Sequence, residues 1–180
     1  MTARAIVGSA LLAAALLPAA TGCTNTDPTK GYTMVSPYPS DVKTVAVSIF
    51  RRGTGEYRRD IEIRLTEAII DQIQAETPYK VVSRGRADTL LTGTLNSVRI
   101  QPLSSDSRTG LAREIQVRLD VDFLWQDLRG AGREQVRRDG FRVAAEYILP
   151  APFSEDFFQG SESAINRAAL RIVEQLAQPW

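Results

Sequence analysis

The sequence contains no histidine, and its only cysteine is Cys23. Histidine is the commonest general base near neutral pH, and with cysteine it supplies most transition-metal ligands. Net charge is also small, because 22 lysines and arginines are balanced by 21 aspartates and glutamates, which leaves +1. A balanced chain has no overall field that favours nucleic acid. The composition therefore argues against an enzyme, a metal site and a nucleic-acid partner, and it predicts no cofactor.

A mainly apolar run occupies residues 6–17 and follows Arg4 near the N-terminus. Its length fits a secretory signal and is too short for a permanent membrane-spanning helix. Residues 20–23, Ala-Thr-Gly-Cys, follow this run and resemble the lipobox of bacterial lipoproteins. In such proteins the cysteine thiol receives a diacylglyceryl group and becomes the mature N-terminus. We expect residues 1–22 to be a signal peptide, Cys23 to be lipidated, and the lipid to hold the protein at a membrane.

The alternative is an ordinary signal peptide cleaved near its small residues, which would leave Cys23 as a free thiol in an oxidising compartment. One cysteine cannot form an intramolecular disulfide, so an unpaired thiol in an exported protein needs an explanation. Acylation supplies that explanation, and several acyl chains on one residue exceed what stable anchoring requires. Residues 23–40 are polar and contain Pro28, Pro37 and Pro39, which predicts a flexible tether. Residues 41–180 have the length of a single domain.

Two amphipathic helices are expected in this domain. Residues 57–76 repeat apolar side chains at helical spacing and end before Thr77 and Pro78. The second helix follows the breaker at residues 150–152, with Ser154 as its N-cap. The apolar positions that define the two stripes are Ile61, Leu65, Ala68, Ile69 and Ile73 in the first, and Phe157, Ile165, Ala168, Ile172 and Leu176 in the second.

Strands are expected at residues 45–50, 79–82, 87–95, 115–126 and 141–149. The strand at 115–126 alternates apolar and polar residues, so one face meets a core and the other meets water. The apolar phase changes between Leu95 and Val98, which predicts a bulge near residues 96–97. Residues 102–112 contain little apolar material and predict a mobile hairpin tip. This order of elements predicts an α+β, two-layer sandwich: one mixed or antiparallel sheet with two helices packed on one face.

Two kinds of polar cluster could carry chemistry. Asp120 and Asp122 share one strand face, as paired carboxylates do in acid–base catalysis, but Arg118 on the same face makes a solvated surface the better interpretation. Arginines gather at residues 51–59, beside the 102–112 tip and at residues 129–138. The planar guanidinium group suits phosphate contacts, although solubilising surface charge explains each cluster as well.

A family resemblance rests on two stretches of the sequence. The first is residues 45–54, Val-Ala-Val-Ser-Ile-Phe-Arg-Arg-Gly-Thr. The second runs from residue 63 through Thr77 and Pro78 to Ala-Asp-Thr-Leu-Leu-Thr-Gly-Thr-Leu at residues 87–95. Together with the lipobox pattern, they resemble LptE, the lipopolysaccharide-assembly lipoprotein family. The second stretch is also similar to other envelope lipoproteins, such as curli-secretion proteins and activators of penicillin-binding proteins.

The LptE resemblance implies a non-catalytic lipoprotein anchored in the outer membrane and facing the periplasm. It also implies that the domain plugs an LptD-like β-barrel and assists the transport of lipopolysaccharide to the cell surface. Arg108 and Arg113 flank the hairpin tip and are our candidates for contacting lipopolysaccharide phosphates. The alternative is a periplasmic adaptor that activates a cell-wall synthase or joins a secretion pore, and the protein that co-purifies with the chain would distinguish the two.

Overall fold

The computed structural model describes residues 36–130, 132–148 and 157–177. The chain divides into two units, Met1–Ser36 and Pro37–Trp180, and the following description concerns the second unit. The predicted signal peptide, the lipidation site at Cys23, most of the tether and the expected N-cap Ser154 lie outside the described residues.

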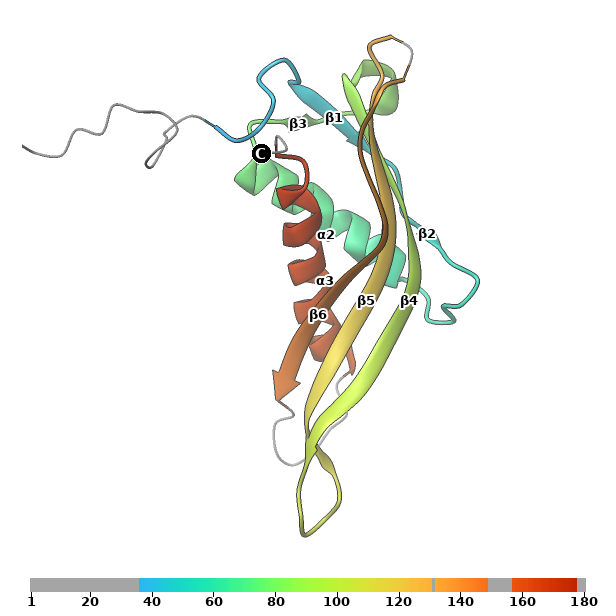
Figure 1. Ribbon diagram of the computed structural model, residues 1–180, viewed down its shortest axis with the longest axis vertical. Helices are drawn as coiled ribbons and strands as arrows, with labels where there is room; N and C mark the ends of the chain where they lie inside the picture. Colours follow the sequence, from blue (N-terminus) through green and yellow to red (C-terminus); the bar gives the residue numbers. More distant parts are fainter. Residues whose placement is uncertain (1–35, 131, 149–156, 178–180) are drawn as a thin grey trace, which may run out of the picture. The chain divides into compact units, whose positions relative to one another are not determined.

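One mixed sheet of six strands forms the first layer of the domain (Figure 1). The neighbouring strands follow the order β3-β1-β4-β5-β6, and β2 pairs with β4 beyond the end of β1. β1 is parallel to β3 and β4, and β2 is parallel to β4, whereas β4, β5 and β6 form an antiparallel meander. The strands are β1 (Thr44–Val47), β2 (Arg51–Arg52), β3 (Lys80–Val81), β4 (Thr89–Ser105), β5 (Ala112–Asp127) and β6 (Glu134–Ile148).

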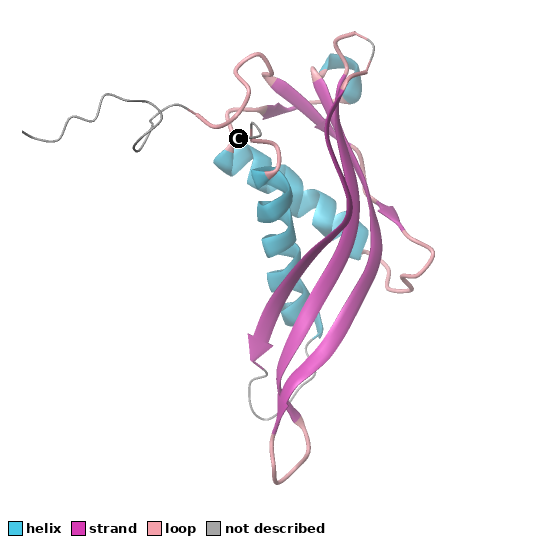
Figure 2. Ribbon diagram, in the orientation of Figure 1, coloured by secondary structure: helices cyan, strands magenta, loops and turns pink. Residues whose placement is uncertain are grey.

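Two helices, α2 (Ile61–Glu76) and α3 (Phe157–Glu174), form the second layer. Both lie on the same side of the sheet (Figure 2). α3 packs against β5 and β6, and α2 packs against α3 and β3. The predicted two-layer α+β architecture is therefore confirmed. The apolar stripes provide the contact, since Ile61, Leu65, Ile69 and Ile73 of α2 and Ile165, Ala168 and Ile172 of α3 are buried.

The alternation of β5 defines the two faces of the sheet. Val117, Leu119, Val121, Phe123 and Trp125 point toward the helices and are buried, and we call this side the covered face. The intervening polar side chains lie on the opposite side, the open face. Each fully buried apolar side chain on the covered face contributes about 1.5–3 kcal/mol of burial free energy. The core is thus fixed by every second residue of β5.

β4 contains the predicted bulge, because its register with β5 shifts between Leu95 and Ser97. The prediction of a loop at residues 102–112 was partly wrong. β4 runs on to Ser105 and β5 begins at Ala112, so the turn itself is limited to residues 106–111. The arms of this hairpin are mostly exposed, and ladder hydrogen bonds between the two backbones hold them together instead of burial. The polar composition of these arms therefore gave no sign in the sequence that they are strands. The mobility of the turn stays a prediction.

β6 begins seven residues earlier than the expected strand, at Glu134 instead of residue 141. Its register with β5 shifts between Val121 and Phe123, and Gly140 has a φ of 64°. Such a bulge inserts one extra residue and reverses the alternation. Val136 and Phe141 consequently both lie on the covered face, where they pair with Trp125 and Val121. In a strand without a bulge, residues of odd and even number would point to opposite faces.

α2 begins at Ile61, four residues after the expected start, so residues 57–60 belong to the preceding loop. Its end at Thr77 agrees with the prediction, and the Thr77 backbone N–H donates a hydrogen bond to the carbonyl of Ile73. Close packing beside α2 requires a glycine in β4. A Cβ on Gly93 would lie 2.2 Å from Cε1 of the buried Phe50 ring.

Candidate functional site

The β4–β5 hairpin end carries the two arginines that the sequence singled out. Arg108 lies in the turn and Arg113 near the start of β5, and both are exposed. Asp106 organises the turn, because its Oδ1 accepts hydrogen bonds from the backbone N–H groups of Arg108 (2.9 Å) and Thr109 (3.0 Å). The hydrogen bonds from Thr109 and Arg108 lower the pKa of Asp106, and the charge of Arg113 adds to the effect. The structure thus brings the two arginines to the same end of the hairpin.

Apolar side chains lie beside these arginines. Leu103 lies in β4 just before the turn and Leu111 is the last residue of the turn, and they are 46% and 48% exposed. Ile148 at the end of β6 is 73% exposed. The pairing of Ile148 with Glu114, and of Glu114 with Ser104, brings the end of β6 to the same end of the hairpin. Sequence reasoning missed this combination because the apolar residues are scattered among polar ones. Positive charge beside exposed apolar surface is the combination that favours an anionic lipid.

The open face is mainly polar along the three long strands, with Leu90, Leu124 and Ala144 as apolar exceptions. Asp120 and Asp122 both lie on it, as the alternation predicts. Asp120 Oδ2 forms an ion pair with Nε of Arg142 at 3.3 Å, and Asp122 Oδ1 accepts a hydrogen bond from the N–H of Gly140 at 2.6 Å. Arg118 was expected to neutralise the aspartates, but its Nη2 donates to Gln116 at 3.0 Å. The two carboxylates therefore bind separate partners and do not form a shared acid–base pair.

Two arginines lie directly opposite each other on this face. Arg99 of β4 pairs in register with Arg118 of β5. Like charges opposite each other in a sheet are destabilising. Within the described residues, neither guanidinium has a carboxylate within ion-pair distance. This part of the open face therefore presents uncompensated positive charge to solvent or to a partner.

Further toward β1, the open face contains a hollow of about 320 Å³. Arg51, Arg84 and Arg137 line it from three different elements. Arg137 is already engaged, because its Nε lies 2.7 Å from Oε1 of Glu134, and this contact raises its pKa and lowers that of Glu134. The rest of the wall is mixed: hydroxyl groups and carboxylates come from Ser48, Thr92, Thr94, Asp122 and Asp139, and apolar groups from Ile49, Phe123 and Leu124.

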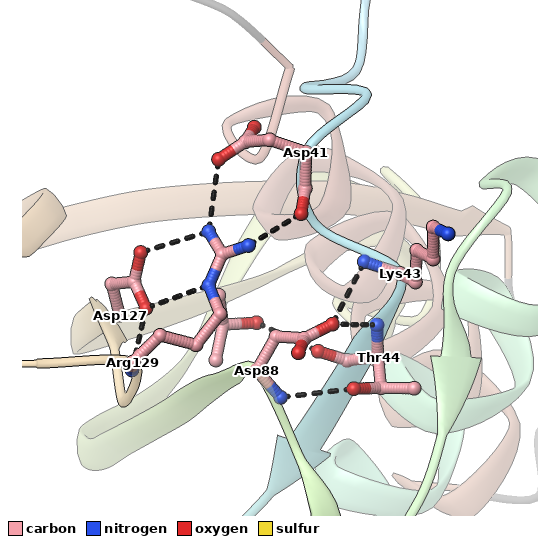
Figure 3. Close-up of polar contacts among 7 residues, drawn as sticks. Asp41, Lys43, Thr44, Asp88, Asp127 and Arg129 are labelled. Atoms are coloured by element: carbon pink, nitrogen blue, oxygen red, sulfur yellow. Dashed lines mark hydrogen bonds and ion pairs between the residues drawn. The ribbon is translucent and has the colours of Figure 1, made fainter.

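Arg129, from a third arginine group, has a structural role (Figure 3). Its Nη2 lies 2.8 Å from Oδ2 of Asp41 and 2.9 Å from Oδ2 of Asp127, and its Nη1 donates a hydrogen bond to the carbonyl oxygen of Asp41. The hydrogen bonds from Arg129 lower the pKa of Asp127. Arg129 thereby ties the start of the domain to the turn after β5.

Asp88 makes the second half of this network. Its Oδ2 accepts hydrogen bonds from the N–H groups of Lys43 (3.0 Å) and Thr44 (2.9 Å), and the Thr44 hydroxyl accepts one from the N–H of Asp88 (2.9 Å). The hydrogen bonds that the Asp88 carboxylate accepts lower its pKa, and the bond from Lys43 has the largest effect, followed by those from Thr44. The chain segment that enters β1 is thus fixed to β4 by polar contacts, at the point where the predicted tether ends.

The described residues contain no group of three acidic, histidine or cysteine side chains placed to hold a metal ion. Neither of the two helices combines the length and apolar character that crossing a bilayer requires. Two surfaces of the described domain stand out: the arginine-bearing hairpin end and the mainly polar open face.

Several solved structures are similar in fold. They include the hypothetical protein CT253 from Chlamydia trachomatis, with 10% identity, a TM-score of 0.49 and coverage of 75% of this chain and 93% of that one. They also include an uncharacterized lipoprotein B from Nitrosomonas europaea, with 16% identity, a TM-score of 0.49 and coverage of 82% and 90%. The rare lipoprotein B from Shewanella oneidensis has 14% identity, a TM-score of 0.43 and coverage of 74% and 90%. No curated protein sequence matches this chain.

The sequence pattern of the LptE family, described as lipopolysaccharide-assembly, matches residues 42–178. The match begins just before β1 and ends just after α3, so it includes every strand and helix described above. It extends far beyond the two stretches that first indicated the resemblance. This chain belongs to the LptE family of lipopolysaccharide-assembly proteins.

Proposed function

We propose that this protein is an outer-membrane lipoprotein that plugs an LptD-like β-barrel and assists the transport of lipopolysaccharide to the cell surface. The lipid on Cys23 holds the chain in the outer membrane, and the domain faces the periplasm. The observation that carries the proposal is the LptE match over residues 42–178. The role is one of binding and positioning, in which no covalent bond of the substrate is made or broken.

The open face supports this role physically. A domain inside a hydrophilic barrel needs a surface whose polar groups remain hydrated or meet polar partners, because a buried unpaired charge is costly. The open face meets that requirement with Arg99, Arg118 and the Asp120–Arg142 pair. We propose that this face is turned toward the wall of the barrel.

The hairpin end is our proposed contact for lipopolysaccharide. Arg108 and Arg113 supply planar, permanently charged donors for lipid phosphates, and Leu103 and Leu111 supply apolar surface beside them. The lipid A part of lipopolysaccharide combines both kinds of group. This assignment depends on the side-chain chemistry of one hairpin end.

Co-purification after mild detergent extraction tests the proposed role. The full chain, tagged at its C-terminus, should bring down an outer-membrane β-barrel as its main partner. Cys23→Ser should lose membrane anchoring and reduce the yield of the barrel. Adding Ser163→Cys, on the exposed part of α3, to Cys23→Ser should restore neither the anchoring nor the yield. Recovery of a cell-wall synthase or a secretion pore in place of the barrel would contradict the proposal and support the adaptor alternative.

The lipid contact has a separate test. The double variant Arg108→Ala/Arg113→Ala should bind purified lipopolysaccharide more weakly, because it removes two charges that face the lipid phosphates. The matched control is Arg167→Ala/Arg171→Ala, which removes two exposed arginines from α3. Equal lipopolysaccharide binding by both double variants would remove the hairpin end from the proposal and leave the barrel-associated role in place.

A further inference from the structure

Tyr57 is the most exposed large hydrophobic side chain among the described residues, at 89% exposure. It lies in residues 53–60, which connect β2 to α2 and which we call the β2–α2 loop. Single exposed apolar side chains are common on protein surfaces, so the exposure of Tyr57 becomes informative only through the contacts that hold its loop. In a flexible loop an exposed aromatic side chain can turn away from solvent. The contacts of residues 53–60 decide whether Tyr57 can turn in this way.

The residue before Tyr57 is held in the interior. Glu56 is only 5% exposed, and its Oε2 accepts a hydrogen bond from the backbone N–H of Val98 at 2.6 Å. Its Oε1 accepts one from the N–H of Arg58 at 2.8 Å and lies 3.5 Å from Nη1 of the same arginine. That Nη1 also donates to the carbonyl of Val98 at 3.2 Å. A buried carboxylate persists only when it is paired in this way.

The start of the loop is equally constrained by the bulge in β4. The pairing of β2 with β4 ends at Arg52 and Leu95, next to the bulge. The N–H of Gly53 then donates to the carbonyl of Leu95 at 2.8 Å. A Cβ on Gly53 would lie 2.9 Å from Cα of Asn96, so only glycine fits at this position. The bulge and the loop are therefore fitted to each other.

The loop also ends in a strained conformation. Asp60 has a φ of 74° and is the one non-glycine residue with positive φ in the described part of the chain. Backbone strain of this kind persists when the surrounding structure imposes it, and it gathers at functional positions. The contacts of Gly53 and Glu56, together with the positive φ of Asp60, thus fix the backbone on both sides of Tyr57.

We infer that the β2–α2 loop is a preorganised docking surface for a protein partner, with the Tyr57 ring as its anchor. Tyrosine and arginine are the residue types that dominate binding hot spots. Arg51, Arg52 and Arg59 are exposed in or next to the loop, and the negative charge of Glu56 is buried and paired, which leaves Asp60 as the exposed carboxylate of the loop. The partner surface is therefore an apolar recess bordered by carboxylates. This inference rests on the proposed function, in which that partner is the β-barrel.

A fixed loop favours a protein over a lipid surface as the occupant. A bilayer interface accepts aromatic side chains in many orientations, so it gains little from a loop constrained at three positions. A folded partner has one complementary recess, and a loop already in its bound conformation loses less conformational entropy on association. The buried Glu56 is a positioning residue in this account, since it acts through the placement of Tyr57.

The test measures association of the lipidated full chain with its co-purified barrel in detergent. Tyr57→Ala should weaken association by at least about tenfold, which corresponds to about 1.4 kcal/mol. Tyr57→Phe should retain most of the affinity, because the ring is the anchor. Leu170→Ala, which truncates an exposed apolar side chain on α3, is the control and should leave association unchanged. None of the three should move the unfolding temperature appreciably.

A photo-crosslinking amino acid at position 57 gives the second readout in intact envelopes. A crosslink to the outer-membrane barrel, identified by mass spectrometry, supports the inference. Crosslinks to lipid alone, or unchanged association of Tyr57→Ala with the barrel, would overturn it while leaving the proposed function intact. Failure of the unaltered chain to associate with any barrel would instead overturn the proposed function and this inference together.

Discussion

The two faces of β5 differ in what they require of each residue. On the covered face, Leu119 and Trp125 are almost completely buried, and any loss of volume opens a cavity against the helices. On the open face, Arg118 is next to Leu119 in the strand, yet it is exposed and lies opposite another arginine. Alternate residues of one strand therefore serve two purposes. The covered face determines stability, and the open face is available for contacts with partners.

The largest expected difference comes from truncating one residue on each face. Leu119→Ala should lower the free energy of unfolding by about 2–5 kcal/mol, because it removes buried methyl groups and leaves a cavity. Arg118→Thr should change it by less than about 0.5 kcal/mol, because it alters an exposed side chain. Denaturant unfolding of both variants measures the comparison. Equal losses would mean that the open face is packed against something other than water.

Gly93→Ala tests the close packing of the covered face without removing any atom. The added methyl group would lie 2.2 Å from the Phe50 ring, so stability should fall by about 1–3 kcal/mol. Phe50→Leu creates space at the same place, and the double variant should lose less than the sum of the two single losses. Additive losses in a double-mutant cycle would show that the ring and the glycine are not in contact.

Acid titration compares the polar network at the start of β1 with the rest of the surface. The folded-state pKa values of Asp88 and Asp127 are lowered, so their contribution to stability is present above the unfolded-state value, near 3.9. It is lost as the pH falls from there through the folded values. Asp88→Asn should flatten the fall in stability across this acidic range, as followed by thermal unfolding. An unchanged slope in Asp88→Asn would show that its hydrogen bonds contribute nothing to the acid dependence of stability.

The smallest expected effect concerns the two opposed arginines. Arg99→Glu replaces a like-charge pair with an opposite-charge pair across from Arg118, which should stabilise the fold by about 0.2–1 kcal/mol. The gain should shrink as salt concentration rises, because exposed charges are screened. Denaturant unfolding at low and high salt measures both effects. A gain that is independent of salt would point to a cause other than charge.

Much of this fold could be predicted from periodicity. The alternation of β5 and the apolar stripe of α2 gave the two layers, and the phase change after Leu95 located the bulge in β4. The first half of β6 was missed because the bulge at Gly140 reverses the alternation, and two phases within one strand look like a loop. The hairpin arms were missed because backbone pairing leaves no apolar signature in the sequence.

The site was less predictable, since its important contacts join residues distant in sequence. Arg108 and Arg113 could be proposed from the sequence because arginine is distinctive in a polar loop, and their contact with lipid stays a prediction. Arg129 appeared equivalent to them, yet it bonds to Asp41, 88 positions away. Glu56 gave no signal, because a glutamate in a polar loop is usually solvated, and the backbone N–H of Val98 that it binds lies 42 positions away in the sequence.

Site-specific crosslinking from the open face tests the central claim most directly. A photo-reactive residue at position 118 in the lipidated full chain should crosslink to an outer-membrane β-barrel in intact envelopes, because we expect the open face to be turned toward the barrel wall. A photo-reactive residue at position 118 that yields only a cell-wall synthase, a secretion pore or no protein at all would contradict the account.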